Sequence, residues 1–326
     1  MHPAFSVIFL TVLLGFGQGI FLAMAAVEIA IFFGLMPALP GADFYVAGSL
    51  VAVIFLIGGL AASFAHLGRP ERAWRAISQW RTSWLSREVI MVPAFIGAVA
   101  IYGLIHYVDW NPVLAERAGA EPFRLSLLVA LGGIVLALTV FLCTGMVYAC
   151  IKFLQEWASP LTVVNYFLLG TASGFVVAAA IAAYRAPALV GFLGIAAILF
   201  TVIAFLTRGA SLIRNARLRP KSTPQSAIGV HHSRIVQKSQ GAMGGSFNTR
   251  EFFHHRSKAF MKSLRWIFLV AVFPVPVLLL LAGLVAGSGE LMTAAAVIQF
   301  LGLLVERWFF LAEANHPQNI YYQSIA

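Results

Sequence analysis

The sequence predicts an all-α integral membrane protein, a bundle of eight transmembrane helices. Of its 326 residues, 60% are hydrophobic and only 10% are charged, whereas about a quarter are charged in ordinary soluble domains. Apolar segments of about 20 residues recur along the chain, and each is long enough to cross a hydrocarbon core of roughly 30 Å as a helix. We therefore treat residues 1–326 as a single membrane domain.

The expected spans follow one another with short polar or proline-containing connections. They cover residues 5–35, 44–65, 87–107, 125–151, 161–184, 187–207, 263–286 and 290–311. The first is not a cleavable signal peptide, because the opening MHPAF lacks a basic region and the apolar run is too long, so we expect it to remain as a helix. Proline removes a helical hydrogen bond, so Pro93, Pro274 and Pro276 can interrupt the third and seventh spans.

Positive charge is concentrated in two loops. The loop at residues 208–261 carries ten Lys and Arg residues between positions 208 and 258, against the single acid Glu251. The loop at residues 66–87 adds five arginines against Glu71. With eight spans, both loops and both ends of the chain lie on one side of the membrane, and the positive-inside rule makes that side cytoplasmic.

The 208–261 loop is expected to be more than a topology signal. A basic run often only sets topology or contacts lipid headgroups, but this loop also contains GAMGGSFNTREFFHHRSKAF. Its Phe247, Phe252 and Phe253 exceed what a solvated linker needs. We expect a basic docking loop for another subunit. Nucleic acid is not an expected partner, because membrane spans separate the arginines.

A histidine and a glutamate flank the 66–87 loop. His66 closes the second expected span and Glu88 opens the third. Taken singly, His66 is explained as an interfacial residue, and Glu88 as a first-turn acid behind an N-cap at Ser86. Together they place a group that titrates near neutral pH beside a carboxylate, as the exchange of electrons and protons with a quinone requires.

The segment between these two residues has interfacial character. Trp74, Trp80 and Trp84 suit an amphipathic interfacial loop along the membrane surface. The neighbouring arginines either add positive charge to a quinone site or pair with acids of a partner. We take His66 and Glu88 as candidate catalytic residues. The candidate quinone-binding set is His66, Glu88, Arg69, Arg72, Arg75, Trp74 and Gln18.

The cysteines do not suit a resident metal. Cys143 and Cys150 are seven positions apart on one expected helix, about 10 Å along its axis, which is too far for a disulfide. We expect both to be small buried packing residues, and no iron-sulfur site can be built from them.

The histidines do not suit an intramembrane haem. Such a haem needs two imidazoles at one depth, whereas eighteen positions separate Glu88 from His106, roughly 27 Å of helix. His66 and His106 are therefore expected at opposite ends, and only His2 and His316 leave a surface haem open. The loop histidines are expected to be solvated or to face a partner; they are His231, His232, His254 and His255.

Polar residues also interrupt the spans. They are Gln18, Glu28, Asn165, Gln299 and Glu306. Charges inside a membrane are costly and often functional. Glu28 suits either an interfacial or a proton-handling position, and we expect Glu306 and Arg307 to pair with the 66–87 loop. Two small-residue motifs, GFGQG at 15–19 and LGTASG at 169–174, have the spacing of close helix contacts.

Several motifs in order resemble one known family. They are MHPAFSVIFLTVLLGFGQG, HLGRPERAWRA with SWLSRE, CTGMVYACIK, SPLTVVNYFLLGTASG, GGSFNTREFFHH and ERWFFLAEANHPQNIYY. These resemble the membrane-anchor subunits of the dimethyl sulfoxide reductase family, within the NrfD-like superfamily, which include the anchor of the membrane-bound cytoplasmic sulfite dehydrogenase. The likeness runs from Met1 to Tyr322 and is weaker near residues 90–120 and 186–220.

The resemblance implies a haem-free bundle in a bacterial inner membrane that binds menaquinone or ubiquinone. It also implies two soluble partners, a four-cluster iron-sulfur subunit and a molybdopterin catalytic subunit. A histidine at the end of the second helix and a glutamate at the start of the third are implied at the quinone site. Here these positions are His66 and Glu88.

The resemblance leaves the direction of electron flow open. Because the docking loop is expected to be cytoplasmic, we favour an anchor for cytoplasmic sulfite oxidation that passes electrons to quinone. The alternative is the anchor of a dimethyl sulfoxide or related reductase that oxidises quinol. A secondary transporter is the alternative from another class. It is not favoured, because the prolines lack a matched internal repeat and few polar residues lie at mid-membrane depth.

Overall fold

The computed structural model describes residues 2–37, 41–65, 67–118, 120–219, 223–236, 254 and 256–317. Within these residues it confirms the all-α prediction, with eight helical segments long and apolar enough to cross a membrane. The only strands in the described ranges form a short antiparallel hairpin, β1 (Val113–Ala115) and β2 (Phe123–Arg124).

The spanning segments agree with the predicted ones to within a few residues at most boundaries. The helices are α1 (Phe5–Phe32), α2 (Asp43–Phe64), α3 (Trp84–Tyr107), α4 (Leu125–Ala149), α5 (Pro160–Arg185), α6 (Val190–Ala216), α9 (Lys258–Val272), α10 (Pro274–Ala286) and α11 (Gly289–Glu313). Short elements are η1 (Pro70–Gln79), η2 (Pro187–Leu189) and α7 (Pro224–Ile228). The predicted end of the sixth span at residue 207 is wrong, because α6 continues to Ala216.

Serine hydroxyls cap the starts of several spans. Ser83 accepts a hydrogen bond from the Ser86 amide at 3.3 Å, and Ser159, Ser257 and Ser288 cap α5, α9 and α11 in the same way. Such caps satisfy amides that lack an intrahelical partner. The expected N-cap at Ser86 is therefore wrong, and Glu88 lies beyond the first turn of α3.

Proline interrupts the seventh span but not the third. Pro93 lies inside a continuous α3, whereas α9 stops at Val272 and α10 begins at Pro274. Pro276 has no amide proton to donate to the Val272 carbonyl four residues earlier. The Gln299 side chain of α11 donates to that carbonyl instead, at 3.1 Å. A neighbouring helix thus stabilises the bend.

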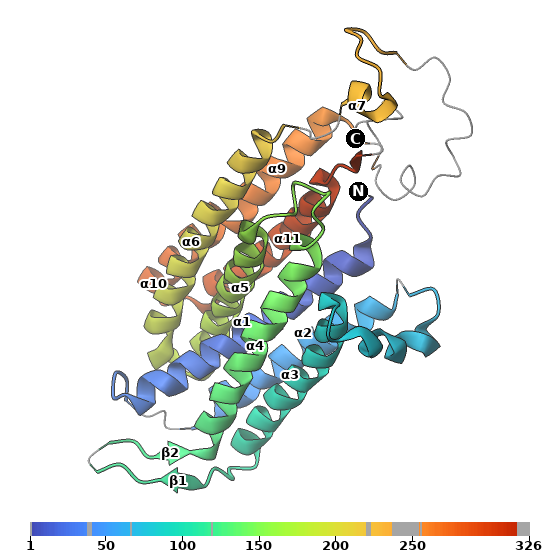
Figure 1. Cartoon of the computed structure of the whole chain (residues 1–326). Helices are drawn as coiled ribbons and strands as arrows, with labels where there is room; N and C mark the ends of the chain where they lie inside the picture. The colour runs from blue at the N-terminus through green and yellow to red at the C-terminus, as the bar shows by residue number, and fades with distance from the viewer. Residues whose placement is uncertain are drawn as a thin grey trace.

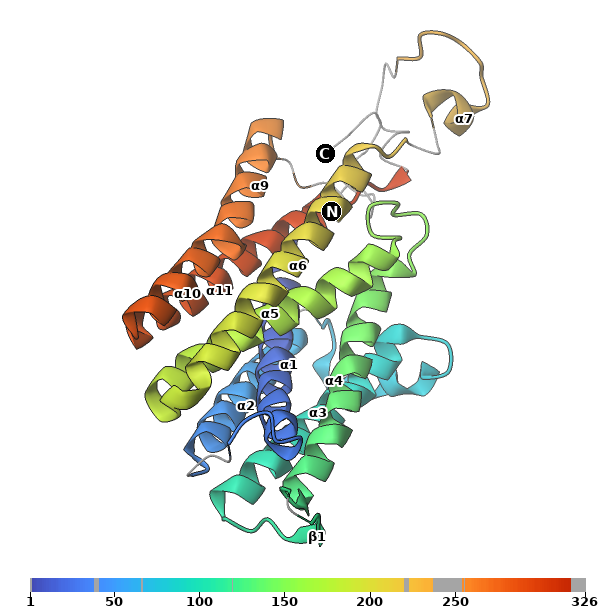
Figure 2. The same cartoon turned by 90° about the vertical axis from the view of Figure 1, so that its left-hand side faces the viewer.

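Two helices lie at the centre of the bundle. Helix α1 packs against α2, α4, α5 and α11, and α5 packs against α1, α4, α6 and α11. Helices α2 and α3 complete a first group, α1–α4, and α6, α9 and α10 complete a second group with α5 and α11 (Figure 2). The two groups meet along the α1–α5 contact.

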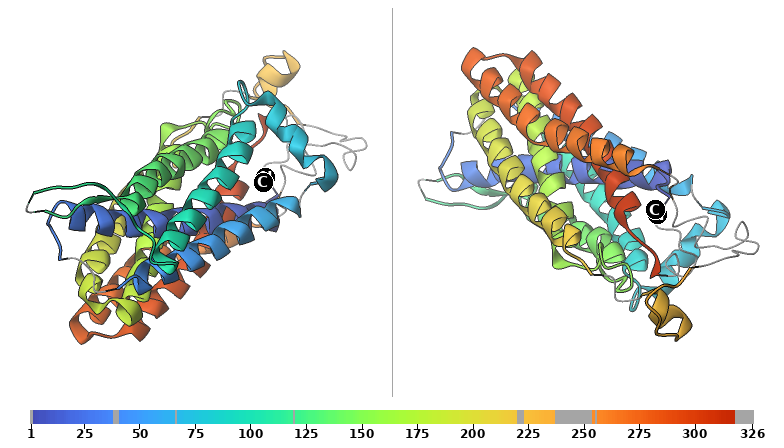
Figure 3. Two further views of the ribbon diagram at one scale, coloured as in Figure 1. Left: turned by 90° about the horizontal axis from the view of Figure 1, so that it is seen from below. Right: turned by 90° about the horizontal axis from the view of Figure 1, so that it is seen from above.

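The ends of the bundle differ in their connections. The start of α1, η1, α7 and the end of α11 lie at one end, and the β1–β2 hairpin lies at the other (Figures 1 and 3). We call the first the basic end, because arginines lie in and around η1 and at the end of α6, among them Arg69, Arg72, Arg75, Arg214 and Arg217. This agrees with an even number of spans.

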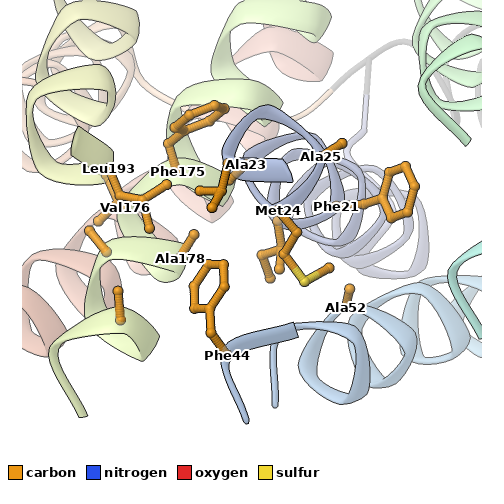
Figure 4. Close-up of a cluster of buried hydrophobic side chains, with 14 of the residues drawn as sticks. Phe21, Ala23, Met24, Ala25, Phe44, Ala52, Phe175, Val176, Ala178 and Leu193 are labelled. Carbon is orange, nitrogen blue, oxygen red and sulfur yellow. The ribbon is translucent and has the colours of Figure 1, made fainter. Parts of the chain in front are cut away.

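The α1–α5 contact is made by small residues, as the glycine motifs predicted. A Cβ built on Gly174 would collide with the Gly19 backbone, and one built on Gly170 would lie 3.2 Å from the Gly15 Cα. Around this contact lies a buried apolar cluster that includes Phe21 of α1, Phe44 of α2 and Phe175 of α5 (Figure 4). Close backbone approach strengthens dispersion contacts where lipid offers no hydrophobic driving force between helices.

We predict that Gly174→Ala lowers the free energy of unfolding of the detergent-solubilised protein by about 1 to 3 kcal/mol, and with it the melting temperature, because the added methyl group meets the α1 backbone. A thermal-shift assay measures the change. Gly132→Ala is the matched control, since a Cβ at Gly132 meets nothing within 4 Å. Equal melting of the two variants would contradict the close contact.

Candidate functional site

Glu88 is buried between α3 and α4. Its carboxylate accepts a hydrogen bond of 2.5 Å from the Thr144 hydroxyl of α4, and its residue exposure is 8%. Among the described residues, no salt bridge involves Glu88. A buried carboxylate held by one neutral hydroxyl retains acceptor capacity on its remaining lone pairs. Glu88 is thus available to a further proton donor.

Thr144 also lines a small polar cavity inside the bundle. The cavity has a volume of about 20 Å³, enough for about one water molecule. Its polar lining includes Gln18, Thr144, Tyr166 and Arg307. The Gln18 side chain donates one hydrogen bond to the Ala137 carbonyl at 3.3 Å. The structure therefore brings Gln18 and the partner of Glu88 to one cavity.

The other predicted site residues are not brought to this cavity. His66 lies outside the described residues, and α2 ends just before it, at Phe64. Arg69, Arg72, Arg75 and Trp74 lie on or beside η1, which has no buried residue. In the described part of the chain, no recorded hydrogen bond or ion pair joins these four residues to Glu88.

Arginine–tryptophan contacts organise the loop around η1. The Arg75 guanidinium lies 5.6 Å from the Trp74 ring, and Arg87 lies 4.3 Å from the Trp84 ring. Arg87 also donates to the carbonyl of Trp80 at 2.9 Å. Trp74 and Trp80 remain 67% and 52% exposed. Exposed tryptophans with adjacent arginines suit the membrane–water interface, and the interfacial role of this loop stays a prediction.

Sequence reasoning missed a buried ion triad in the second helix group. The two carboxylate oxygens of Glu306 contact Arg208 Nε and Arg307 Nε, each at 2.7 Å. All three side chains are almost fully buried. The expected pairing of Glu306 and Arg307 with the 66–87 loop is wrong, because Arg208 of the extended α6 reaches Glu306 instead. The Arg208–Glu306 pair was not predicted from the sequence, because Arg208 was assigned to the loop that follows the sixth predicted span.

A second polar cluster lies near the opposite end of the bundle. The Glu28 carboxylate accepts hydrogen bonds from Tyr102 at 2.7 Å and from Ser126. His106 stacks on Tyr45 with ring centroids 4.4 Å apart. Glu28 is therefore tied to α3 and α4 by two hydroxyls. Its partner Tyr102 places it well away from Glu88, since Glu88 and Tyr102 are fourteen positions apart on α3, roughly 21 Å.

Neither the cysteines nor the histidines assemble into a metal site in the described ranges. Both cysteines are free; Cys143 is buried as expected, but the same expectation for Cys150 is wrong, because it is exposed. His254 is buried rather than solvated, and its Nδ1 accepts from the Arg256 amide at 3.1 Å. His255 and the three docking-loop phenylalanines lie outside the described residues.

Comparison with known proteins gives a match over nearly the whole chain. The family model described as "DMSO reductase anchor subunit (DmsC)" matches residues 1–312. The chain is also 54% identical, over 326 residues and the full length of both proteins, to a subunit of the sulfite dehydrogenase of Allochromatium vinosum.

The ion triad gives a test of its structural role. We predict that Glu306→Ala costs about 3 to 5 kcal/mol of stability, because it leaves two buried arginines without their carboxylate. The yield and thermal melting of the membrane-extracted protein measure the effect. Glu71→Ala is the control, because its 3.9 Å contact with Arg72 is exposed and worth little. Similar behaviour of both variants would exclude the triad as a stabilising element.

Proposed function

The chain belongs to the family of DMSO reductase anchor subunits, and from this we propose that it attaches an iron-sulfur subunit and a molybdopterin subunit to the membrane and passes electrons between them and the quinone pool. A multi-pass bundle of eight spans suits this role. The match along nearly the whole chain favours an anchor over a secondary transporter. The observation that carries the quinone site is the buried carboxylate of Glu88, held by one hydroxyl beside a polar cavity.

The polar groups near Glu88 fit a quinone headgroup in their chemistry. A quinone takes up two electrons and two protons when it is reduced to the quinol, and its ring oxygens need hydrogen-bond partners. Glu88, Thr144 and Gln18 supply a carboxyl, a hydroxyl and an amide. The cavity itself holds about one water molecule and not a ring. We therefore place the headgroup beside Glu88 at the basic end of α2–α4, with the cavity behind it.

In this proposal the two candidate catalytic residues have different tasks. His66 donates a hydrogen bond to one headgroup oxygen, and Glu88 takes or gives the proton that accompanies electron transfer. Thr144 orients the Glu88 carboxyl through the 2.5 Å hydrogen bond. Gln18 holds the inner wall of the cavity through its bond to Ala137.

The exposed residues in and around η1 are assigned to the protein surface and not to the quinone site. Arg69, Arg72, Arg75 and Trp74 are far more accessible than Glu88. We assign them to the membrane–water interface and to acidic groups of the iron-sulfur partner. Their positive charge also raises the local potential on the basic end, which favours a negatively charged headgroup form at short range.

Sulfite is the proposed substrate of the complex. The support is the 54% identity to a protein named as part of a sulfite dehydrogenase. Electrons then flow from the molybdopterin subunit through the iron-sulfur subunit to quinone, with both soluble subunits on the cytoplasmic side of a bacterial inner membrane. The family name instead favours a dimethyl sulfoxide reductase that oxidises quinol. Purification of the intact complex and assay of both substrates separates these candidates.

We predict that Glu88→Gln and His66→Ala each slow quinone reduction by the intact complex about 100-fold or more, because a positioned acid–base group contributes a factor of that order. Oxidation of substrate with a soluble dye as acceptor, measured on the same membranes, stays near the wild-type rate. Thr144→Ser keeps the hydroxyl and most activity, whereas Thr144→Val loses part of it.

Glu71→Gln controls for loss of an acid in the preceding η1 segment, since Glu71 is exposed. Wild-type quinone kinetics in Glu88→Gln would remove Glu88 from the mechanism. Loss of dye-linked and quinone-linked activity together would show failed assembly rather than a damaged quinone site.

We further predict that deletion of residues 241–256 releases the soluble subunits from the membrane. Most of this segment lies outside the described residues, so the prediction rests on its basic and aromatic sequence. Immunoblots of membrane and soluble fractions measure the release. Full retention of both subunits on the membrane would show that they dock elsewhere, and the η1 loop is then the next surface to vary.

A further inference from the structure

A long apolar groove lies on the second helix group, away from the proposed quinone site. Its volume is about 630 Å³, and it is lined on one side by α6 and on the other by α9 and α10. Thr201 and Ala216 mark its extent along α6, and Arg265 and Trp266 lie on the α9 wall. No residue of α1–α4 lines it.

The proline bend makes this groove part of the fold. Helix α9 packs mainly against α11, whereas α10 packs against both α6 and α11. The chain changes direction at Phe273, between the two helices. Because α10 lies against α6 and α9 does not follow it there, a space remains between α6 and α9. Gln299 fixes the bend by its bond to the Val272 carbonyl.

The dimensions and lining suit a hydrocarbon chain. Thr201 and Ala216 are fifteen positions apart, roughly 22 Å along α6, which is more than the depth of one leaflet of a hydrocarbon core of about 30 Å. Most lining side chains are apolar, among them Phe205, Leu212 and Phe273. A Cβ built on Gly209, in the middle of the α6 wall, meets nothing within 4 Å, so the space there is open.

Cations stand at the basic end of the same groove. Arg265 lines it, Lys262 lies one turn earlier on α9, and Arg217 follows Ala216 at the end of α6. All three are exposed, and none forms a salt bridge in the described part of the chain. Basic positions beside an apolar cleft at headgroup depth are the elements that bind an anionic lipid phosphate.

We propose that this groove binds one anionic phospholipid, with an acyl chain between α6 and α9 and its phosphate at Arg265, Lys262 and Arg217. A quinone fits the position less well, because it presents no phosphate to three cations. A second copy packed through the same groove would bring no carboxylate to those cations, since the apolar wall carries no acid. The proposal is independent of the quinone site.

The test uses the intact complex in mild detergent, with native mass spectrometry and lipid extraction. The wild-type protein is expected to retain a phosphatidylglycerol or cardiolipin molecule, and added phosphatidylglycerol raises its melting temperature more than phosphatidylethanolamine does. Gly209→Phe fills the groove and is expected to lower retention at least tenfold. Gly191→Phe is the matched control on the same helix, since its position is equally open but does not line the groove.

Arg265→Gln removes the charge at an exposed position, together with the contact of the guanidinium with the Phe309 ring at 5.9 Å. It is expected to weaken phosphatidylglycerol retention several-fold and to leave phosphatidylethanolamine unchanged. Unaltered retention in both Gly209→Phe and Arg265→Gln would overturn the proposal. Equal retention of charged and zwitterionic lipids, or recovery of quinone or of a dimer that Gly209→Phe dissociates, would overturn it as well.

Discussion

The hydrocarbon around this bundle offers no hydrogen bonds, so every polar side chain placed in a span must find its partner inside the protein. For three carboxylates in the spans, a partner comes from another helix. Glu88 of α3 binds Thr144 of α4, Glu28 of α1 binds Tyr102 of α3, and Glu306 of α11 binds Arg208 of α6. Each contact fixes the axial position of one helix relative to another. Apolar packing alone sets register weakly in lipid, because lipid tails are as apolar as leucine.

The need for partners inside the protein also distinguishes two kinds of buried carboxylate: one paired with arginines, and one that can still accept a hydrogen bond. Both oxygens of Glu306 contact arginine nitrogens, so this carboxylate is held as a paired ion. Within the described ranges, Glu88 has one recorded hydrogen-bond partner, the neutral hydroxyl of Thr144. A group that must exchange protons needs an unfilled side and a position near solvent or a carrier, and Glu88 at the basic end meets both requirements better than Glu306 does. Glu28, with two hydroxyl partners, lies between these cases.

The sequence was sufficient for the spans and for the close helix contacts, because hydropathy and small-residue spacing are local patterns. It was not sufficient for partners far apart along the chain. Thr144 lies 56 positions from Glu88 along the chain, and neither residue type indicates that the two side chains form a hydrogen bond. Arg208 was counted with a loop because a charge usually ends a span, yet its carboxylate partner allows α6 to continue for two more turns. Ser83 and Ser86 both precede Glu88, and only the backbone geometry shows which one caps α3.

The central α1–α5 contact separates the helix group that contains Glu88 from the group that contains the apolar groove. Glycines at this contact bring the α1 and α5 backbones together, so the groups share a seam with little free space beyond a water-sized cavity. Glu88 belongs to the first group, and the apolar groove between α6 and α9 belongs to the second. No residue of α1–α4 is among those that line the groove. The lipid proposed for this groove and the quinone proposed beside Glu88 would therefore occupy separate sites.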